Sequence, residues 1–144
     1  MRQGLLAMWL GLVLVLAGCG GGGGGGSGQP PLTAEEDALV GSYALVGFDW
    51  RVDGAWYDEY DFVSWGGDLA LGAGRDFYQR LYADGYSSLE RGTWYAYNGT
   101  FEVYEAIDQV TVLGAYAYDG VVLAYDYIDP ITGDRQVNYW QRLR

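Results

Sequence analysis

The side chains that could do chemistry in this chain are one cysteine, Cys19, and 19 carboxylates, because the chain contains no histidine and no lysine. Without imidazole there is neither the usual base for a serine nucleophile nor a histidine ligand for zinc. A single cysteine also excludes a disulfide within the chain. Paired carboxylates could serve glycoside hydrolysis, but no spacing marks two of the 19 as such a pair. We therefore expect a protein that is not an enzyme and that carries no cofactor.

Two acidic segments could bind a hard cation through oxygen ligands. Asp58-Glu-Tyr-Asp61 is the densest group of carboxylates, and Asp129 and Asp134 bracket a loop that contains Thr132 and Gly133. Calcium takes carboxylate and carbonyl oxygens, so either segment has suitable groups. Neither has the regular spacing of a calcium loop. We therefore expect solvated acidic segments and no metal site.

Cys19 stands between an apolar run and seven consecutive glycines. Residues 1–18 contain the charged Arg2, an uncharged apolar run and small residues before the cysteine, which is the composition of an export signal. The apolar run is too short for a comfortable membrane span. Residues 20–31 carry no side chain able to bury area, so they predict a flexible tether.

Leu16-Ala17-Gly18-Cys19 resembles the lipobox of bacterial lipoproteins, and all four positions match. The resemblance implies that the signal is removed before Cys19, that its thiol receives a diacylglycerol, and that the new amino terminus takes a fatty acyl chain such as palmitate. Two or three acyl chains, at about 0.8 kcal/mol per buried methylene, hold a protein on a bilayer. Gly20 follows the cysteine, and this resembles the pattern of enterobacterial lipoproteins sent to the outer membrane. We expect a protein of the bacterial cell envelope, with the leaflet left open.

The expected organisation is a signal peptide at 1–18, the lipidated cysteine and tether at 19–32, and one domain at 33–144. From Cys19 onward the chain has 7 arginines against 19 acidic residues, a formal charge of −12. This charge repels phosphates, so we expect no nucleic acid as a partner.

The domain has the pattern of an all-β fold with a short helical start. Thr33-Ala-Glu-Glu36 has the spacing of a capping box, which predicts one or two helical turns. Segments rich in Tyr, Trp, Val and Phe then alternate with turn signals. We expect strands near 40–51, 55–62, 67–72, 76–82, 92–98, 100–107, 110–118, 121–128 and 135–143.

Asp-Gly and Asn-Gly pairs between these segments favour tight antiparallel hairpins. The pairs Asp53-Gly54, Asn98-Gly99 and Asp119-Gly120 suit the type I′ turn, which needs positive φ at both central residues. Eight or nine sequential strands leave two long edges unless they close on themselves. An antiparallel up-and-down β-barrel of 8–9 strands is the first expectation, and a β-sandwich is the alternative.

Three segments resemble the lipocalin-like domains of bacterial lipoproteins, over residues 39–144. They are Leu39-Val-Gly-Ser-Tyr-Ala-Leu-Val46, Gly67-Asp-Leu-Ala-Leu71 and Tyr139-Trp-Gln-Arg-Leu143. In lipocalins a tryptophan of the first strand packs beneath an arginine of the last strand, at the closed end of the barrel. Here Tyr43 stands at the tryptophan position, and the resemblance implies Arg142 as its partner. It also implies a barrel that holds a small apolar ligand.

Aromatic side chains are the candidate ligand-binding groups, with 14 tyrosines, 5 tryptophans and 4 phenylalanines after the signal. Inside a barrel they could line a pocket for a small apolar or aromatic molecule, or simply fill the core. The residues expected to line a pocket are Trp56, Phe77, Tyr95, Tyr97, Tyr116 and Tyr125. The alternative function is a non-enzymatic interaction module, which would bind another envelope protein through a tyrosine-rich outer face.

Overall fold

The structure is a computed structural model that describes residues 28–144. The predicted signal peptide, Cys19 and most of the predicted tether lie outside the described residues. Pro31–Arg144 form one compact unit, which contains all of the buried core. Among the described residues, no helix has the length and apolar character needed to cross a membrane.

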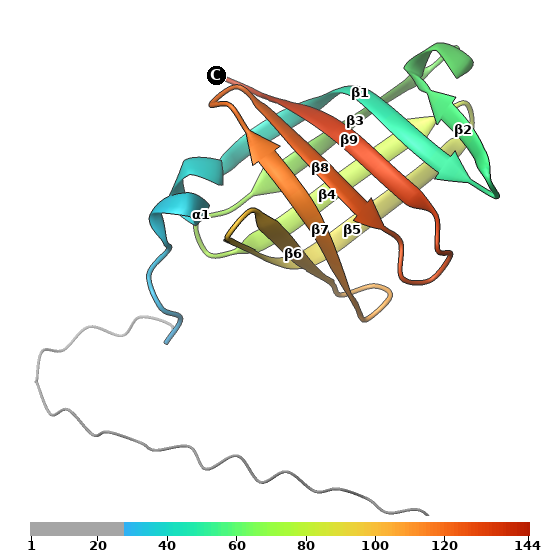
Figure 1. The fold of residues 1–144 in the computed structure, drawn as a ribbon. Helices are drawn as coiled ribbons and strands as arrows, with labels where there is room; N and C mark the ends of the chain where they lie inside the picture. The colour runs from blue at the N-terminus through green and yellow to red at the C-terminus, as the bar shows by residue number, and fades with distance from the viewer. Residues whose placement is uncertain (1–27) are drawn as a thin grey trace, which may run out of the picture. The chain divides into compact units, whose positions relative to one another are not determined.

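The described part of the chain consists of one short helix followed by nine strands (Figure 1). The elements are α1 (Ala34–Leu39), β1 (Gly41–Val52), β2 (Ala55–Asp58), the 3-10 turn η1 (Glu59–Asp61), β3 (Trp65–Leu71), β4 (Asp76–Ala83), β5 (Tyr86–Tyr97), β6 (Thr100–Glu105), β7 (Val110–Tyr118), β8 (Val122–Ile128) and β9 (Arg135–Arg142).

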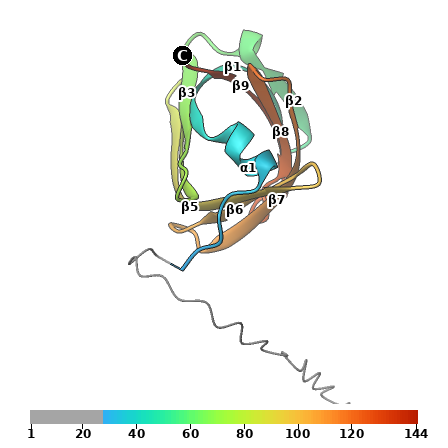
Figure 2. The same ribbon diagram turned by 90° about the vertical axis from the view of Figure 1, so that its left-hand side faces the viewer.

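The strands form one antiparallel sheet in the order β2-β1-β3-β4-β5-β6-β7-β8-β9, and β1 also pairs with β9. The second pairing closes eight strands into a barrel and leaves β2 as an extra strand (Figures 1 and 2). Apart from β2, neighbours in sequence are neighbours in the sheet. The up-and-down barrel is therefore confirmed, and the sandwich alternative is wrong.

Tight turns fix the register of the hairpins. Asp53-Gly54 and Asn98-Gly99 have positive φ at both residues, as the type I′ turn requires. At Asp119-Gly120 only the glycine has positive φ, because the Asp119 carboxylate accepts the N–H of Val122 and holds a different turn. Asp84-Gly85 instead supplies a further pair with both φ angles positive.

Two predicted strand boundaries are wrong for local reasons. β5 begins at Tyr86 rather than at residue 92, because the polar segment after the Asp84-Gly85 turn pairs with β4 over its whole length. The segment predicted as a strand over 55–62 leaves the sheet after Asp58. The Asp58 carboxylate there accepts the N–H of Tyr60, and Asp61 accepts the N–H of Asp58, so a 3-10 turn forms.

The end of the barrel at which β1 begins is closed by α1, which lies across the opening in Figure 2. The predicted capping box is present, since Thr33 and Glu36 accept hydrogen bonds from each other's backbone N–H. Glu36 also accepts two hydrogen bonds from Arg75, at 3.0 and 2.9 Å. The Glu36 and Arg75 side chains are only 3% and 5% exposed. This bidentate ion pair fastens the helix to the β3–β4 turn.

The expected partners Tyr43 and Arg142 face each other in register on β1 and β9. Arg142 donates to the carbonyls of Ala38 and Val40 at the end of α1, and the Tyr43 hydroxyl donates to the Leu39 carbonyl at 2.6 Å. Both side chains therefore bind the last carbonyls of the helix, which the helix itself leaves unpaired. Burial, with the nearby Tyr118, raises the pKa of Tyr43 to about 12, so its hydroxyl stays a donor.

We predict that Glu36→Gln destabilises the barrel by about 3 kcal/mol, because it leaves the buried Arg75 guanidinium without its carboxylate. Urea unfolding of the Pro31–Arg144 unit measures this free energy of unfolding. Asp37→Asn removes a charge from the same helix at an exposed position and is the matched control. Equal midpoints for the two variants would show that the ion pair does not hold the helix.

Candidate functional site

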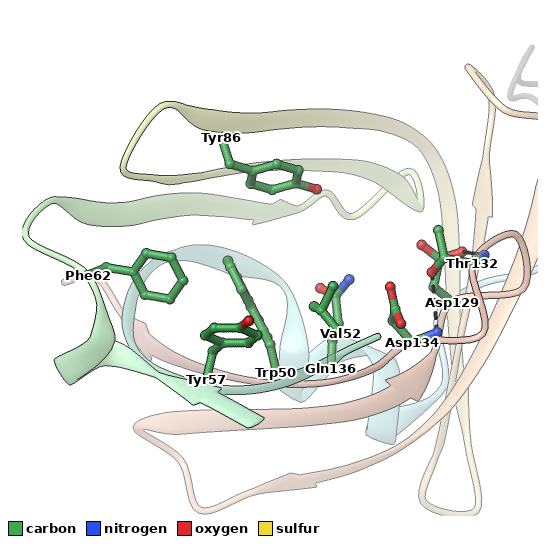
Figure 3. Close-up of a pocket in the computed structure, with 9 residues that line it drawn as sticks. All are labelled: Trp50, Val52, Tyr57, Phe62, Tyr86, Asp129, Thr132, Asp134 and Gln136. Carbon is green, nitrogen blue, oxygen red and sulfur yellow. Dashed lines mark hydrogen bonds between the residues drawn. The ribbon is translucent and has the colours of Figure 1, made fainter. Parts of the chain in front are cut away.

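The opposite end of the barrel contains a cavity of about 360 Å³ (Figure 3). It is lined by Trp50, Val52, Tyr57, Phe62, Tyr86, Asp129, Thr132, Asp134 and Gln136. Figure 3 shows the aromatic side chains towards one side of this cavity and Asp129, Thr132 and Asp134 towards the other. The cavity thus has an apolar wall and a polar wall.

A split in the barrel wall makes room for this cavity. β3 pairs with β1 only over Gly41–Ala44, whereas β2 pairs with β1 over Asp49–Val52. The first residues of β3 pair only with β4, so the two strands separate towards this end. Phe62, from the segment that joins η1 to β3, fills part of the gap and packs 5.5 Å from the Phe48 ring.

Trp50 is the fixed centre of the aromatic wall. Its ring stacks on Phe48 at 4.2 Å and meets the rings of Phe62 and Tyr86 edge-on at 6.0 and 6.2 Å. Its indole N–H donates to Asn138 Oδ1 at 2.9 Å, inside the barrel. Packing and this hydrogen bond hold the wall in place without a ligand.

The carboxylates considered for calcium mostly bind backbone groups. Asp129 accepts the N–H groups of Ile131 and Thr132, and Asp134 accepts the N–H of Asp53. The Asp58–Asp61 group is bound to its own backbone in the 3-10 turn, and does not line the cavity. Both segments act here as turn caps.

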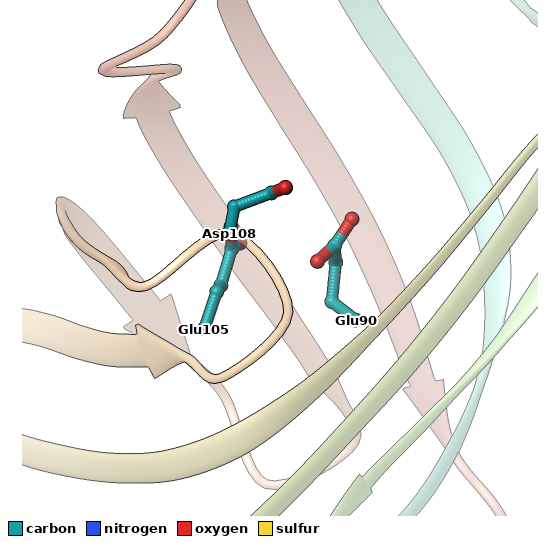
Figure 4. A group of neighbouring side chains, drawn as sticks. All are labelled: Glu90, Glu105 and Asp108. Atoms are coloured by element: carbon teal, nitrogen blue, oxygen red, sulfur yellow. The ribbon is translucent and has the colours of Figure 1, made fainter.

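A different acidic cluster lies directly beside the cavity. Glu90, Glu105 and Asp108 bring carboxylate oxygens within 4.8 Å of one another, and Figure 4 shows Glu90 facing the other two. They line a smaller polar space of about 60 Å³, which shares Tyr86, Asp129 and Gln136 with the aromatic cavity. The acidic space and the aromatic cavity are therefore adjacent, with these three side chains at their boundary.

Burial and mutual repulsion raise the pKa values of two members of this cluster, Glu105 and Glu90. Burial, together with the charges of Glu90, Asp129 and Asp108, raises the pKa of Glu105 to about 7. Burial and the charges of Asp108 and Asp129 also raise the pKa of Glu90. The Glu90 Oε2 atom is buried and has no hydrogen-bond partner among the described residues. None of the three carboxylates forms an ion pair with an arginine among the described residues.

The core beneath the cavity is unusually polar for a barrel interior. Gln79 and Asn138 are buried, and the buried Tyr127 donates to Gln136 at 2.8 Å. Three further buried atoms have no hydrogen-bond partner within residues 28–144: the Tyr125 hydroxyl, Asn138 Nδ2 and Trp140 Nε1. Buried polar groups normally find hydrogen-bond partners, and in this core these three atoms do not.

None of the six side chains expected to line a pocket reaches the aromatic cavity. Phe77 and Tyr125 are buried in the barrel core. Tyr116 lies near the helix end, where its hydroxyl donates to Glu35 and it lines a shallow groove. These three side chains therefore lie in the barrel interior or near the helix, and none of them lines the cavity.

The other three expected residues lie on the outer surface, which corrects the prediction. Trp56, on β2, is exposed and has the Arg51 guanidinium 5.9 Å from its ring centre. Tyr95 and Tyr97 are exposed because Trp94 and Ala96 occupy the inward positions of β5. The predicted register of β5 was one residue off, and such a slip exchanges the two faces.

The residues that do line the site gave uneven signals in the sequence. Trp50 lies two residues after Phe48 on the expected first strand, so alternation places both rings on one face. Tyr86 follows the Asp84-Gly85 turn, which marks the start of a strand. Glu90 and Glu105 are far apart in sequence, and only the β5–β6 register brings them together.

No protein-family model matches this chain, and no curated protein matches it either. The site is therefore interpreted from its own geometry.

We predict that stability falls as the pH rises from about 5 to about 8, because the native state holds a proton on Glu105 that the unfolded state has already released. The pKa values of Glu35 and Glu36 are lowered instead, so their stabilisation is lost only below about pH 4.5 and is constant in this window. Glu105→Gln should make stability depend less on pH. At pH 8 the melting temperature of this variant should be about 4 °C higher than that of the native protein.

Calorimetry of both proteins across this range measures the effect. Asp37→Asn also removes one carboxylate, at an exposed position of α1 distant in sequence from the cluster. Its stability should fall with pH as steeply as that of the native protein. A slope that is unchanged in Glu105→Gln would contradict the raised pKa.

Proposed function

We propose that this protein is a non-enzymatic binding protein of the bacterial cell envelope, anchored through acyl chains on Cys19, whose barrel holds a small apolar or aromatic ligand. The single observation that carries the proposal is the aromatic cavity at the open end of the barrel. Small-molecule sites are mostly apolar, concave and largely preformed, with volumes of about 300–1,000 Å³. A cavity of about 360 Å³ falls at the small end of this range.

The side chains around the cavity suit a flat, apolar ligand. Trp50 and Phe62 present ring faces and edges from β1 and from the η1–β3 segment, and Tyr86 faces them from the start of β5. Aromatic contacts in offset or edge-on geometry contribute about 0.5–1.5 kcal/mol beyond the area they bury. Because α1 covers the far end, the ligand would enter between β2 and the 129–134 loop.

Binding without catalysis agrees best with the groups in the cavity. The three clustered carboxylates lie closer together than the separation of about 5 Å or more that glycosidases use between their catalytic pair. Burial and repulsion raise the pKa values of both Glu90 and Glu105, whereas a catalytic acid and base need pKa values that are pushed apart. The chain offers no histidine to complete a different catalytic site.

The proposed anchor rests on the lipobox-like Leu16-Ala17-Gly18-Cys19 and on the glycine-rich segment after it. If residues 20–31 form the tether that their composition predicts, these twelve residues would span about 20 Å on average between the bilayer and the barrel. The membrane would be the outer membrane if Gly20 acts as it does in enterobacterial lipoproteins.

A second candidate function is an interaction module that binds another envelope protein. The outer face of β5, β6 and β7 carries four exposed apolar or aromatic side chains, which are Tyr95, Tyr97, Tyr104 and Leu113. Exposed apolar groups that gather on one face favour contact with a protein. This candidate becomes the better one if the cavity binds nothing.

Replacing Cys19 by Ser tests the anchor, because it removes the thiol that would carry the diacylglycerol. In a bacterial host we expect the native chain to label with palmitate and to sediment with membranes, and the variant to lose both properties. Fractionation and metabolic labelling measure this. A variant that still sediments with washed membranes would disprove the lipid anchor.

The ligand-binding proposal is tested with N-phenyl-1-naphthylamine, an uncharged probe that fluoresces in apolar sites. We expect the Pro31–Arg144 unit to bind it, and the double variant Tyr57→Ala, Phe62→Ala to bind about tenfold more weakly or worse. Tyr60→Ala is the matched control, since Tyr60 belongs to the same 3-10 segment but is 88% exposed and does not line the cavity.

Fluorescence titration gives the dissociation constants. A native protein that leaves the probe dark, or a control variant that loses as much affinity as the double variant, would contradict binding in this cavity.

A further inference from the structure

We infer that the ligand of the cavity is an organic cation: an aromatic or apolar body held by Trp50 and Tyr86, with an ammonium group that reaches the carboxylates of Glu90 and Glu105. This inference rests on the proposed function, because it names the chemical class that the same cavity would take. It arises from the adjacency of an aromatic cavity and an acidic space that share the lining residues Tyr86, Asp129 and Gln136.

The charges around the two adjacent spaces favour a cation. Five carboxylate side chains line them, and none of the described residues that line either space is an arginine. The five are Glu90, Glu105, Asp108, Asp129 and Asp134. A fatty acid or another anion would place a further negative charge in this field, and an uncharged ligand would leave the repulsion in place.

Unpartnered buried atoms in and near the cluster provide a second indication. Glu90 Oε2 is buried and has no hydrogen-bond partner among the described residues, and neither does the hydroxyl of Tyr125, a residue only 4% exposed. The charge of Glu105 acts on Tyr125, and the Tyr125 ring stacks on Tyr127, which lines the acidic space. An ammonium group has three donors, so it can bind Glu90 Oε2 and a carboxylate oxygen of Glu105 at once.

The aromatic wall distinguishes an organic cation from a metal ion. Calcium requires six to eight oxygen ligands and gains nothing from an apolar wall. The acidic space is also lined by Leu81 and Val112, which supply no oxygen from their side chains. Aromatic rings attract cations through their faces, and Trp50 and Tyr86 therefore stabilise the part of an organic cation next to its charge.

Tryptamine and tryptophol are the probes, because they share an indole ring and a two-carbon side chain. Tryptamine ends in a charged ammonium group, whereas tryptophol ends in a neutral hydroxyl group. Isothermal titration of the Pro31–Arg144 unit should give tryptamine about tenfold higher affinity, as expected for one charge-assisted hydrogen bond. Glu105→Gln should remove most of this preference, because it weakens tryptamine binding far more than tryptophol binding. Asp37→Asn also removes one negative charge, at an exposed position of α1, and should keep the preference for tryptamine.

The outcomes separate the inference from the proposed function. If N-phenyl-1-naphthylamine binds but tryptamine and tryptophol bind equally, the inference is overturned and the binding proposal stands. If neither indole nor the naphthylamine binds, both are overturned. Calcium chloride is titrated in parallel: calcium that binds through Glu105 and excludes tryptamine would show a metal site and overturn the organic cation.

Discussion

The pairing of β1 with β9 is the constraint on which the rest of the molecule depends. It joins the first strand to the last and removes the two long edges that an open sheet of this length would expose. β1 must then divide its other edge between β3 and β2, since its twelve residues are longer than the stretch of β3 that reaches it. The opening of the wall, and with it the cavity, follows from this division.

The two ends of the barrel treat polar groups in opposite ways. At the helix end nearly every charge has a partner: Glu36 binds Arg75, Glu35 accepts from Tyr116 and from the Asn98-Gly99 turn, and Arg142 caps α1. Around the cavity at the open end, five carboxylates line the two adjacent spaces, and no arginine is among the described residues that line them. Pairing at the first end stabilises the fold, which lets the second end carry groups that oppose folding.

Local signals in the sequence were sufficient for the fold but not for the site. Thr33–Glu36 and Asn98-Gly99 act through their own backbone, so their structure could be read from a few residues. Which face of β5 points into the barrel could not be predicted in this way. Trp94 and Tyr95 are both large aromatic residues, so the alternation of residue types does not show which of them is buried. The contact of Glu90 with Glu105 depends on strand register, which no short segment specifies.

The acidic cluster is a part of the barrel whose residues work against its stability. Like charges held together and half-buried raise their own pKa values, and a glutamine at Glu105 would remove that cost. Groups that disagree with the rest of a fold in this way are typical of functional sites. A cation bound among them would lower their pKa values again and release protons. Binding, proton release and barrel stability would then be one linked equilibrium, centred on the end of the molecule that its helix leaves open.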